Sequence, residues 1–174
     1  MLVTNLPTLV TSLGARFLRP LLCIRNKSQD IMMKTSQKGI DLIKEFEGFR
    51  ATAYRCPAGR WTIGYGHTAS AYEDMQITRE QAEKLLKGDI AEAEAVVEEA
   101  CPVLTQNRFD ALVSFVFNVG RGNFLRSTLL KCVKANPDNL DVRDEFMRWN
   151  KSKGMVLAGL MRRRRAECNL YFAS

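Results

Sequence analysis

The stretch that decides the fold runs from Glu47 to Thr68 and reads EGFRATAYRCPAGRWTIGYGHT. Ahead of it, a helix is predicted by apolar residues at helical spacing, Ile40, Ile43 and Phe46. Beyond Gly48, large apolar residues alternate with small or polar ones around the turn-forming segment 57–59, which is typical of a β-hairpin. The chain is therefore expected to pass from helix to hairpin directly after Glu47.

The second strand of this hairpin is predicted to have two unlike faces. Strand side chains alternate, so one face carries the bulky residues Trp61, Ile63 and Tyr65. The other face carries Thr62 and two glycines, and glycine in a strand marks a bulge or a close approach of ligand or backbone. The spacing leaves two interpretations open, a structural ribbon and a surface that binds a ligand beside the helix end.

Three groups capable of chemistry stand at fixed spacing in this stretch: Glu47, Cys56 and Thr62. They are set in Glu-Gly-x-Arg-x-x-Ala-Tyr and Thr-Ile-Gly-Tyr-Gly-His-Thr, and this arrangement resembles the catalytic stretch of phage-type lysozymes, the endolysins of glycoside hydrolase family 24. The resemblance implies that Glu47 is the general acid and that Thr62 helps to hold the attacking water. Cys56 occupies a position that is usually aspartate and sometimes cysteine in the family.

The implied role of Glu47 sets a physical requirement. Glycosidic bond cleavage needs a protonated acid at the leaving oxygen and a second group on the opposite face of the sugar. An ordinary glutamate is mostly ionised at neutral pH, so its surroundings must favour the neutral form. The aromatic residues expected to provide such desolvation are Phe46, Phe49 and Tyr54.

Cys56 departs from the family's more common aspartate. A thiol has an ordinary pKa of about 8.5 and is mostly neutral at pH 7 unless a neighbouring cation lowers that pKa. Arg55 and Arg60 are the cations close to it in sequence. Its role is left open among general base, nucleophile and polar lining.

Length and composition limit the functions that the chain can have. With 174 residues, 46% of them hydrophobic, the chain is long enough for one domain with a buried core. Its net charge of +7 predicts an anionic partner, which could be nucleic acid, a membrane surface or the bacterial cell wall. Five cysteines without Cys-x-x-Cys spacing and a single histidine indicate neither a zinc site nor a complete disulfide framework, so reduced thiols are expected.

Residues 1–33 are expected to be an N-terminal extension, and residues 34–174 to be the phage-type lysozyme domain. Prolines and arginines interrupt the apolar residues of the extension, so no run approaches the ~20 residues that span a bilayer. The opening also lacks the basic region of a secretory signal. Met32 and Met33 directly precede the domain, which favours a start codon assigned too far upstream over a targeting segment or a poorly inserted anchor.

The helices on either side of the hairpin can be placed from their end signals. Thr35 or Ser36 is expected to cap the first helix. Residues 78–81, Thr-Arg-Glu-Gln, form a capping box that opens a long helix of about twenty residues, which spans ~30 Å and can bridge two lobes. Its acidic face is interpreted as solvated, and its members are Glu80, Glu83, Glu92, Glu94, Glu98 and Glu99.

The remainder of the chain is also predicted to be helical. A helix beginning near Thr105 places an apolar stripe in the core, formed by Phe109, Leu112, Val113, Val116 and Phe117. Segments 106–120, 124–130 and 146–167 resemble the second-lobe helices of the same family, so the resemblance covers about residues 36–171. The family's usual Pro-Gly-Leu reads Ala-Gly-Leu here, at residues 158–160.

Two further sets of charged residues support the site in this interpretation. Four consecutive arginines at 162–165 are spread around a helix, so they do not form a single face that tracks phosphates. The resemblance implies that Arg163 or Arg164 turns inward to pair with Glu47 while the others face solvent. It also implies that His67 pairs with an acid of the long helix, for which Asp89 is the candidate, as part of the scaffold.

The sequence thus predicts a mainly α (α+β) fold, lysozyme-like and two-lobed, with a small N-terminal β-hairpin or sheet, a helical C-terminal lobe and a long helix that joins them. The resemblance implies an endolysin or muramidase that hydrolyses β-1,4 bonds between N-acetylmuramic acid and N-acetylglucosamine in bacterial peptidoglycan and causes host cell lysis. We expect a monomer that uses no metal or organic cofactor, binds no nucleic acid and has no stable membrane span. It would be made in the host cytoplasm and act on the wall after release.

Two other classes remain as alternatives. A lysozyme-shaped binding module would hold wall polymer without cutting it, if Cys56 in place of aspartate abolishes catalysis. A nucleic-acid binder driven by charge is the weaker alternative.

Overall fold

The computed structural model describes residues 32–56 and 58–174, and residues 32–174 form one compact unit. Residues 1–31 of the expected extension, 1–33, lie outside the described residues. Met33, just before the expected start of the domain, packs against the core. Along the chain the elements are α1 (Gln37–Glu47), β1 (Arg50–Arg55), β2 (Trp61–Gly64), α2 (Arg79–Ala100), α3 (Gln106–Val119), α4 (Arg121–Arg126), α5 (Thr128–Ala135), α6 (Asp141–Met147), β3 (Lys151–Ser152), β4 (Met155–Val156) and α7 (Ala158–Tyr171).

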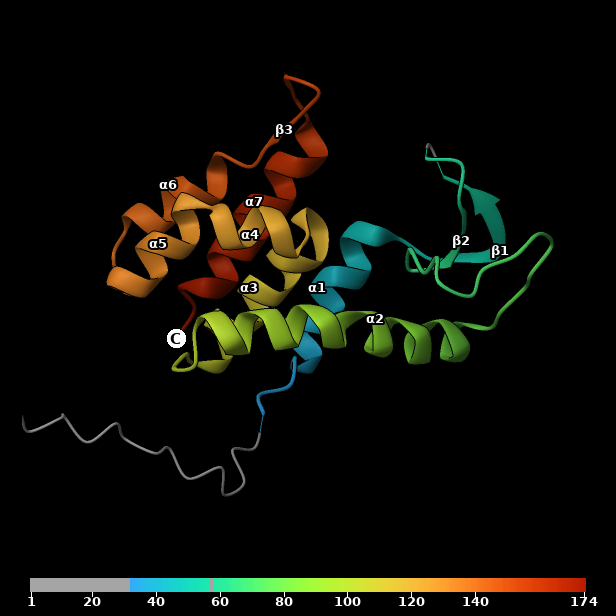
Figure 1. The fold of residues 1–174 in the computed structure, drawn as a ribbon, viewed down its shortest axis with the longest axis horizontal. Helices are drawn as coiled ribbons and strands as arrows, with labels where there is room; N and C mark the ends of the chain where they lie inside the picture. Colours follow the sequence, from blue (N-terminus) through green and yellow to red (C-terminus); the bar gives the residue numbers. More distant parts are fainter. Residues whose placement is uncertain (1–31, 57) are drawn as a thin grey trace, which may run out of the picture. The chain divides into compact units, whose positions relative to one another are not determined.

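The predicted fold class, mainly helical with a small sheet, is confirmed. β1 and β2 pair as an antiparallel hairpin, and α3 to α7 gather around one core (Figure 1). Helix α2 contacts both β2 and α3, so it joins the hairpin region to the helical group as expected. Helix α1 comes first in the chain but packs on α3 and α7, which places its C-terminal residue, Glu47, between the two regions.

The long helix begins where the capping box predicts. The backbone N–H of Thr78 donates to the Gln81 side chain at 2.8 Å, and the Gln81 backbone N–H donates to the Thr78 hydroxyl at 3.3 Å. These reciprocal bonds satisfy two of the N–H groups that lack partners at a helix start. The helix has 22 residues, which corresponds to ~33 Å. None of the described helices is both long and apolar enough to cross a membrane.

Helix α3 is the centre of the helical group. Eight consecutive residues, 109–116, are buried, so this helix is covered on nearly all sides rather than along one stripe. The Phe115 ring makes edge-to-face contacts with Phe146 and Trp149, each at 5.5 Å between ring centroids. Because α3 is immobilised on all sides, the side chains it presents to α1 and α7 are held in fixed positions.

The start of α1 differs from the expected side-chain cap. Ser36 is the N-cap residue but makes no cap bond, and its backbone N–H and hydroxyl donate instead to the carboxylate of Asp110 on α3. Thr35 donates from its backbone N–H and its hydroxyl to Glu94 on α2, at 2.8 and 2.9 Å. These bonds fasten the start of α1 to α2 and α3.

The interpretation of Glu94 as part of a solvated face is therefore wrong. Its side chain is buried. It accepts the hydrogen bonds from Thr35 and forms a 2.9 Å ion pair with Lys34. Burial favours the neutral carboxyl, but the hydrogen bonds from Thr35 and Lys34 outweigh it and lower the pKa of Glu94. Composition could not distinguish this one glutamate from its exposed neighbours because its partners come from a distant segment.

The second strand of the hairpin is shorter than its alternating pattern predicts. β2 ends at Gly64, and a tight turn lets Ile63 and His67 exchange both backbone hydrogen bonds at 2.9 Å. Gly64 has a positive φ of +64°, and a Cβ there would meet Ala82 at 3.1 Å and Ile77 at 3.2 Å. The close approach at this glycine is to α2, so a ligand-binding strand face at Gly64 is ruled out.

A second hairpin, β3–β4, was not predicted from the sequence. Its turn residues Lys153 and Gly154 both have positive φ, +49° and +81°. Two such residues form the tight turn that suits the twist of a two-stranded hairpin. Figure 1 shows this hairpin projecting from the helical group just before α7.

Replacing Gly64 by alanine tests the packing of β2 against α2. Gly59→Ala in the same hairpin is the matched control, since Gly59 also has a positive φ, +77°, but no atom lies within 4 Å of its added Cβ. Both variants incur the backbone cost of a left-handed conformation, about 1–2 kcal/mol. We expect Gly64→Ala to lose a further ~1–3 kcal/mol from overpacking.

Chemical denaturation of both variants gives this difference in the free energy of unfolding. Equal losses would contradict the packing of Gly64 against α2.

Candidate active site

Glu47 lies at the end of α1, where the chain turns toward the hairpin. Its side chain is 24% exposed, and its Oε1 accepts a 2.6 Å bond from Nη1 of Arg163 on α7. A Cβ at Gly66 would lie 3.7 Å from the other carboxylate oxygen. The bare backbone of Gly66, which follows β2, therefore leaves room beside the Glu47 carboxylate.

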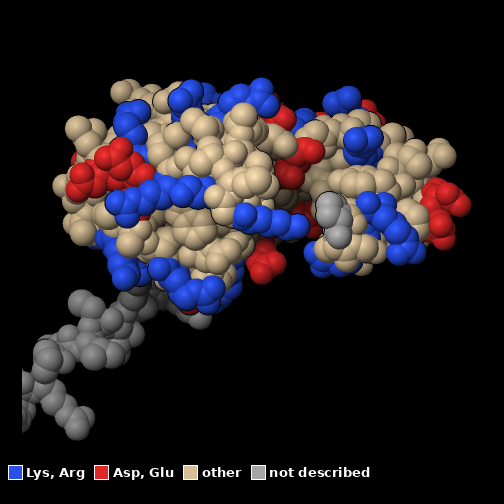
Figure 2. All heavy atoms as spheres, turned by 90° about the horizontal axis from the view of Figure 1, so that it is seen from above, with Lys and Arg blue, Asp and Glu red and all other residues tan. Residues whose placement is uncertain are grey.

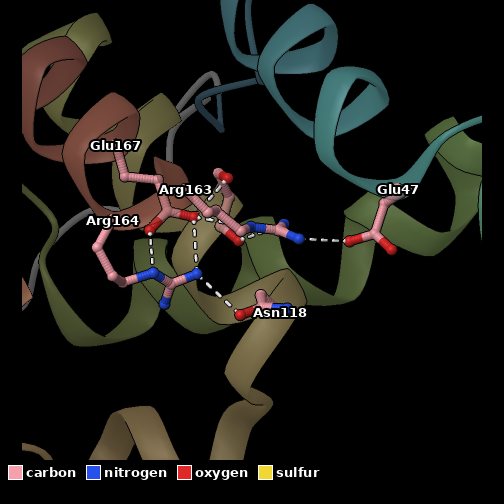
Figure 3. Close-up of polar contacts among 6 residues, drawn as sticks. Glu47, Asn118, Arg163, Arg164 and Glu167 are labelled. Carbon is pink, nitrogen blue, oxygen red and sulfur yellow. Dashed lines mark hydrogen bonds and ion pairs between the residues drawn. The ribbon is translucent and has the colours of Figure 1, made fainter. Parts of the chain in front are cut away.

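Arg163 is held on every side of its guanidinium group (Figure 3). Nε donates to Glu167 Oε1 at 3.1 Å, Nη2 donates to the Ser114 carbonyl at 3.2 Å, and Nη1 reaches Glu47. The Arg163 side chain is only 4% exposed. A guanidinium with three fixed partners presents its charge to Glu47 from one position.

Arg164 does not follow the expectation that the remaining arginines face solvent. It is fully buried, donates to Asn118 at 2.8 Å and pairs with Glu167 through Nε at 3.0 Å. Burial lowers the pKa of Arg164 to about 10, which still leaves the group charged at neutral pH. Only Arg162 and Arg165 of the four-arginine run are exposed.

Three residues of this network were missed by sequence reasoning: Ser114, Asn118 and Glu167. Glu167 is fully buried, and its Oε1 also accepts 2.8 Å and 3.2 Å bonds from the Ser114 hydroxyl and from Arg164. Its position four residues after Arg163 and three after Arg164 is the spacing at which helical side chains meet. That spacing was the available signal for the pairing with Glu167, whereas the α3 partners required the tertiary structure.

The half-buried Cys56 thiol lies in the hairpin turn, close to backbone N–H groups that favour its thiolate. The backbone N–H groups of Arg60 and Ala58 have the largest effects and lower the pKa of Cys56. Burial opposes them, and the Thr62 hydroxyl and the Arg60 charge add smaller lowering effects. Arg60 acts on this pKa mainly through its backbone N–H group, whereas the expectation was an effect of its charge, which contributes least. Arg55 instead lies over an aromatic ring of the hairpin, 4.8 Å from its centroid.

Thr62 belongs to β2 and is placed beside Cys56 by the register of the hairpin. Tyr54 of β1 pairs with Thr62, and the Cys56 backbone N–H donates to the Arg60 carbonyl at 2.9 Å. The Thr62 side chain is buried, and its hydroxyl can donate either to the Arg60 carbonyl at 3.3 Å or to the thiol. The hairpin therefore brings a thiol with a lowered pKa and a hydroxyl together.

His67 pairs with Asp89 as the resemblance implies. Its Nδ1 lies 2.9 Å from both carboxylate oxygens of Asp89 on α2. Nε2 accepts from the Ser70 backbone N–H at 3.2 Å, and since a backbone N–H can only donate, the arrangement fits a neutral ring protonated at Nδ1. This pairing ties the turn after β2 to α2.

The aromatic residues near Glu47 are placed unequally. Phe46 lies under the Arg163 guanidinium, 5.7 Å from it, and lines the same hollow as Glu47. Phe49 packs on Tyr65 at 5.7 Å, whereas Tyr54 is 41% exposed. Because Tyr54 is exposed, the structure does not support the expectation that Tyr54 helps to desolvate Glu47.

The Glu47 carboxylate opens into a hollow of about 590 Å³, a size typical of ligand sites. It lies between the end of α1, the end of α3 and the start of α7, and its lining residues are Glu45, Phe46, Glu47, Asn118, Leu157, Gly159, Leu160, Arg162 and Arg163. A hollow of about 170 Å³ between α2 and α3 contains Asp89 but lacks both Glu47 and Cys56. We place the candidate site in the larger hollow because it contains the candidate acid.

Charged side chains of both signs line this hollow, namely Glu45, Glu47, Arg162 and Arg163. Figure 2 shows basic groups dispersed over one face, with acidic groups among them and at the constriction between the larger and smaller parts.

Among residues 32–56 and 58–174, no cluster of His, Cys, Asp and Glu side chains has the geometry to hold a metal ion.

Comparison with known proteins identifies the family. Residues 44–167 match the family model described as phage lysozyme. The chain belongs to the phage lysozyme family. This match covers Glu47, the hairpin and the Arg163–Glu167 network, so the resemblance inferred from the sequence is confirmed.

Individual relatives of this lysozyme agree with the family assignment. It is 46% identical over 144 residues to the endolysin of Acyrthosiphon pisum secondary endosymbiont phage 1, covering 80% of this chain and 98% of the relative. It is 46% identical to the endolysin of Bacillus phage B103, of which it spans about half the length, 54%. The muramidase domain of SpmX from Asticaccaulis excentricus has a TM-score of 0.76 and 41% identity, covering 81% of this chain and 99% of that domain. These relatives confirm the expectation of a glycoside hydrolase of the lysozyme type.

The Cys56 environment of the lysozyme predicts unusual thiol reactivity. Alkylation by iodoacetamide requires the thiolate, so its rate rises as pH passes the thiol pKa. We expect Cys56 to reach half its maximal rate below the ordinary value of about 8.5 because the backbone N–H groups of Arg60 and Ala58 favour the thiolate. Burial raises the pKa of Cys101 and Cys168, which should react slowly.

Peptide mass spectrometry after timed alkylation at several pH values measures each rate. Cys132 is the matched control because it is half-buried like Cys56. A Cys56 midpoint at or above that of Cys132 would show that the turn does not activate the thiol.

Proposed function

We propose that this lysozyme is a muramidase that hydrolyses the β-1,4 bond between N-acetylmuramic acid and N-acetylglucosamine in bacterial peptidoglycan, with Glu47 as its general acid. The observation that carries the proposal is the Glu47 carboxylate, which is partly exposed to a ligand-sized hollow while Arg163 fixes its position. The relatives named endolysin and muramidase domain support the reaction. The protein would act as a monomer on the cell wall after release.

The first chemical step requires a proton at the glycosidic oxygen. Glu47 would give its proton to that oxygen as the bond from C1 to oxygen breaks, so that the second sugar leaves as an alcohol. Arg163 lies at 2.6 Å and favours the ionised carboxylate that remains after this transfer. The same pair opposes protonation before the reaction, so the free enzyme must balance these two demands.

The second step requires water at C1 on the other side of the sugar. Cys56 would serve as the base that removes a proton from this water, and the Thr62 hydroxyl would orient the water. The lowered pKa of Cys56 supports this role because a base must be ionised near the working pH. His67 and Asp89 would keep the turn that follows β2 in place, and Arg164 would support Arg163.

The surface charge fits the proposed substrate. A net charge of +7 favours association with an anionic wall polymer, an effect that salt screens. The arginine run contributes less exposed charge than its sequence indicates, because Arg163 and Arg164 are buried in ion pairs. Peptidoglycan is therefore the proposed partner rather than nucleic acid.

Replacing Glu47 by glutamine tests the role of the acid. An amide cannot donate the proton that the leaving oxygen needs, so we expect turbidity clearing of permeabilised Gram-negative cells to slow by a factor on the order of 10² or more. Glu73→Gln is the control, since Glu73 is an exposed glutamate that does not line this hollow. That control should keep activity within a few-fold of the unmodified enzyme.

Circular dichroism and wall-pelleting of both variants establish that they fold and bind. Near-full clearing by a folded Glu47→Gln variant would exclude Glu47 as the acid. Wall binding without clearing by the unmodified chain would favour a binding module.

Substitutions at Cys56 separate a base from passive lining. Cys56→Asp should keep or raise activity, because a carboxylate is fully ionised at pH 7 and can also accept a proton from water. Cys56→Ala should lose activity by on the order of 10² or more because no base remains. Initial clearing rates at fixed ionic strength give the comparison.

A thiol oxidant supplies the internal control for these variants. It should inhibit the unmodified enzyme through Cys56 but spare Cys56→Asp. Equal inhibition of both, or full activity of Cys56→Ala, would assign Cys56 to the lining of the site.

A further inference from the structure

The ion pair between Glu47 and Arg163 poses a problem for the proposed chemistry. A guanidinium at 2.6 Å stabilises the carboxylate, whereas a general acid must carry its proton when substrate binds. If Arg163 had no other anionic partner, its full charge would hold Glu47 ionised. The structure provides such a partner on the opposite side of the guanidinium, the fully buried Glu167.

Four charged groups form a continuous chain from the hollow to the protein interior (Figure 3). Glu47 contacts Arg163, Arg163 contacts Glu167, and Glu167 contacts Arg164, at 2.6, 3.1 and 3.0 Å. Two carboxylates and two guanidiniums balance to zero when Glu47 is ionised. Protonation of Glu47 leaves one positive charge, which the chain spreads over two guanidiniums.

Two guanidiniums flank the buried Glu167 carboxylate and favour its ionised form. Its Oε1 receives N–H or O–H groups from Arg163, Arg164 and Ser114, and its Oε2 lies 3.0 Å from Arg164 Nε. Opposite charges this close favour the charged form of a carboxyl group. Burial raises the pKa of Glu167, and both guanidiniums and the Ser114 hydroxyl oppose that rise.

We propose that Glu167 is a positioning residue for the reaction: it fixes Arg163 and shares its charge, so that Glu47 can hold its proton in the free enzyme. This inference rests on the proposed role of Glu47 as the acid. Glu167 acts through Arg163, and the α3 groups Ser114 and Asn118 fix it and Arg164 in turn. Arg163 can therefore orient Glu47 without holding it fully ionised.

Other charged groups near Glu47 are few in the part of the chain that the structure describes. Glu45 and Arg162 line the same hollow, on α1 and α7, and both are exposed. Lys44 on α1 is paired with Glu83 of α2.

The charges at the other end of α7 belong to different contacts. Arg143 of α6 lies over the Phe172 ring at 5.0 Å, and it and Asp144 act on Cys168. Glu167 is thus the buried anion that balances Arg163.

The expected effect of Glu167→Gln follows from the charge count. Removing one negative charge leaves an excess positive charge beside Arg163, which favours ionised Glu47. A general acid loses activity as pH rises through its titration midpoint. The basic limb of the pH–activity profile should therefore move to lower pH, by about one unit.

Substitution of Arg164 should shift the pH–activity profile in the opposite direction. Arg164→Gln removes a positive charge from the same chain, so the basic limb should move to higher pH. A purely structural role predicts lower stability for both variants and no opposed shift. Where Glu167→Gln does not fold, Arg164→Gln carries the same test.

The direct measurement is the ¹³C chemical shift of the Glu47 carboxyl, followed across pH in the full chain with labelled glutamate. It reports protonation whether or not the enzyme turns over, so a failure of the proposed function is seen separately in Glu47→Gln. Glu45→Gln is the control, because it removes an exposed carboxylate near Glu47 outside the buried chain and should shift the midpoint only slightly.

A lower Glu47 midpoint in Glu167→Gln together with a higher one in Arg164→Gln supports the inference. An unchanged midpoint in either folded variant, or a shift of the same sign in both, overturns it.

Discussion

The structure depends on one constraint, the placement of a carboxylate at a helix end against a guanidinium that comes from the other end of the domain. Glu47 and Arg163 are 116 residues apart in sequence and 2.6 Å apart in space. Forming this contact requires α1 and α7 to pack on the same central helix. Much of the helical group can be understood as the support that α3 gives to these two elements.

The same constraint explains why so many polar groups are buried beside a hydrophobic core. A guanidinium taken out of water is costly unless its N–H groups and its charge are satisfied. Arg163 donates to Glu47, to Glu167 and to the Ser114 carbonyl. Arg164 pairs with Glu167 and donates to Asn118. The hairpin is held mainly by backbone contacts. Its register places Thr62 of β2 beside Cys56, and the backbone of Gly64 packs on α2.

Local signals in the sequence predicted most of the fold. The capping box at Thr78, the helix-to-hairpin change at Glu47 and the apolar stripe of α3 are encoded within a few residues, so they were predictable. The resemblance added expected roles for Glu47 and Thr62, which spacing alone left open, while the role of Cys56 stayed open. The resemblance limited the arginine that pairs with Glu47 to Arg163 or Arg164. The structure assigns this contact to Arg163.

The features that the sequence did not reveal depend on partners far away in the chain. Glu94 resembles its exposed neighbours until Thr35 is placed beside it. Gly64 fits a ligand-binding strand face equally well until Ala82 is found against it. Arg164 belongs to a basic run that is expected to be exposed, but it is buried in contact with Glu167 and Asn118. In each case, a tertiary contact overrides a local pattern.

The central claim is that water cleaves the bond at C1 of N-acetylmuramic acid with a proton supplied by Glu47. The most direct measurement is the identity of the new chain ends, obtained by borohydride reduction of a peptidoglycan digest and analysis of the reduced sugars. The account predicts reduced N-acetylmuramic acid at the new ends from the unmodified enzyme and almost none from Glu47→Gln. Reduced N-acetylglucosamine, or new ends that borohydride cannot reduce, would contradict it.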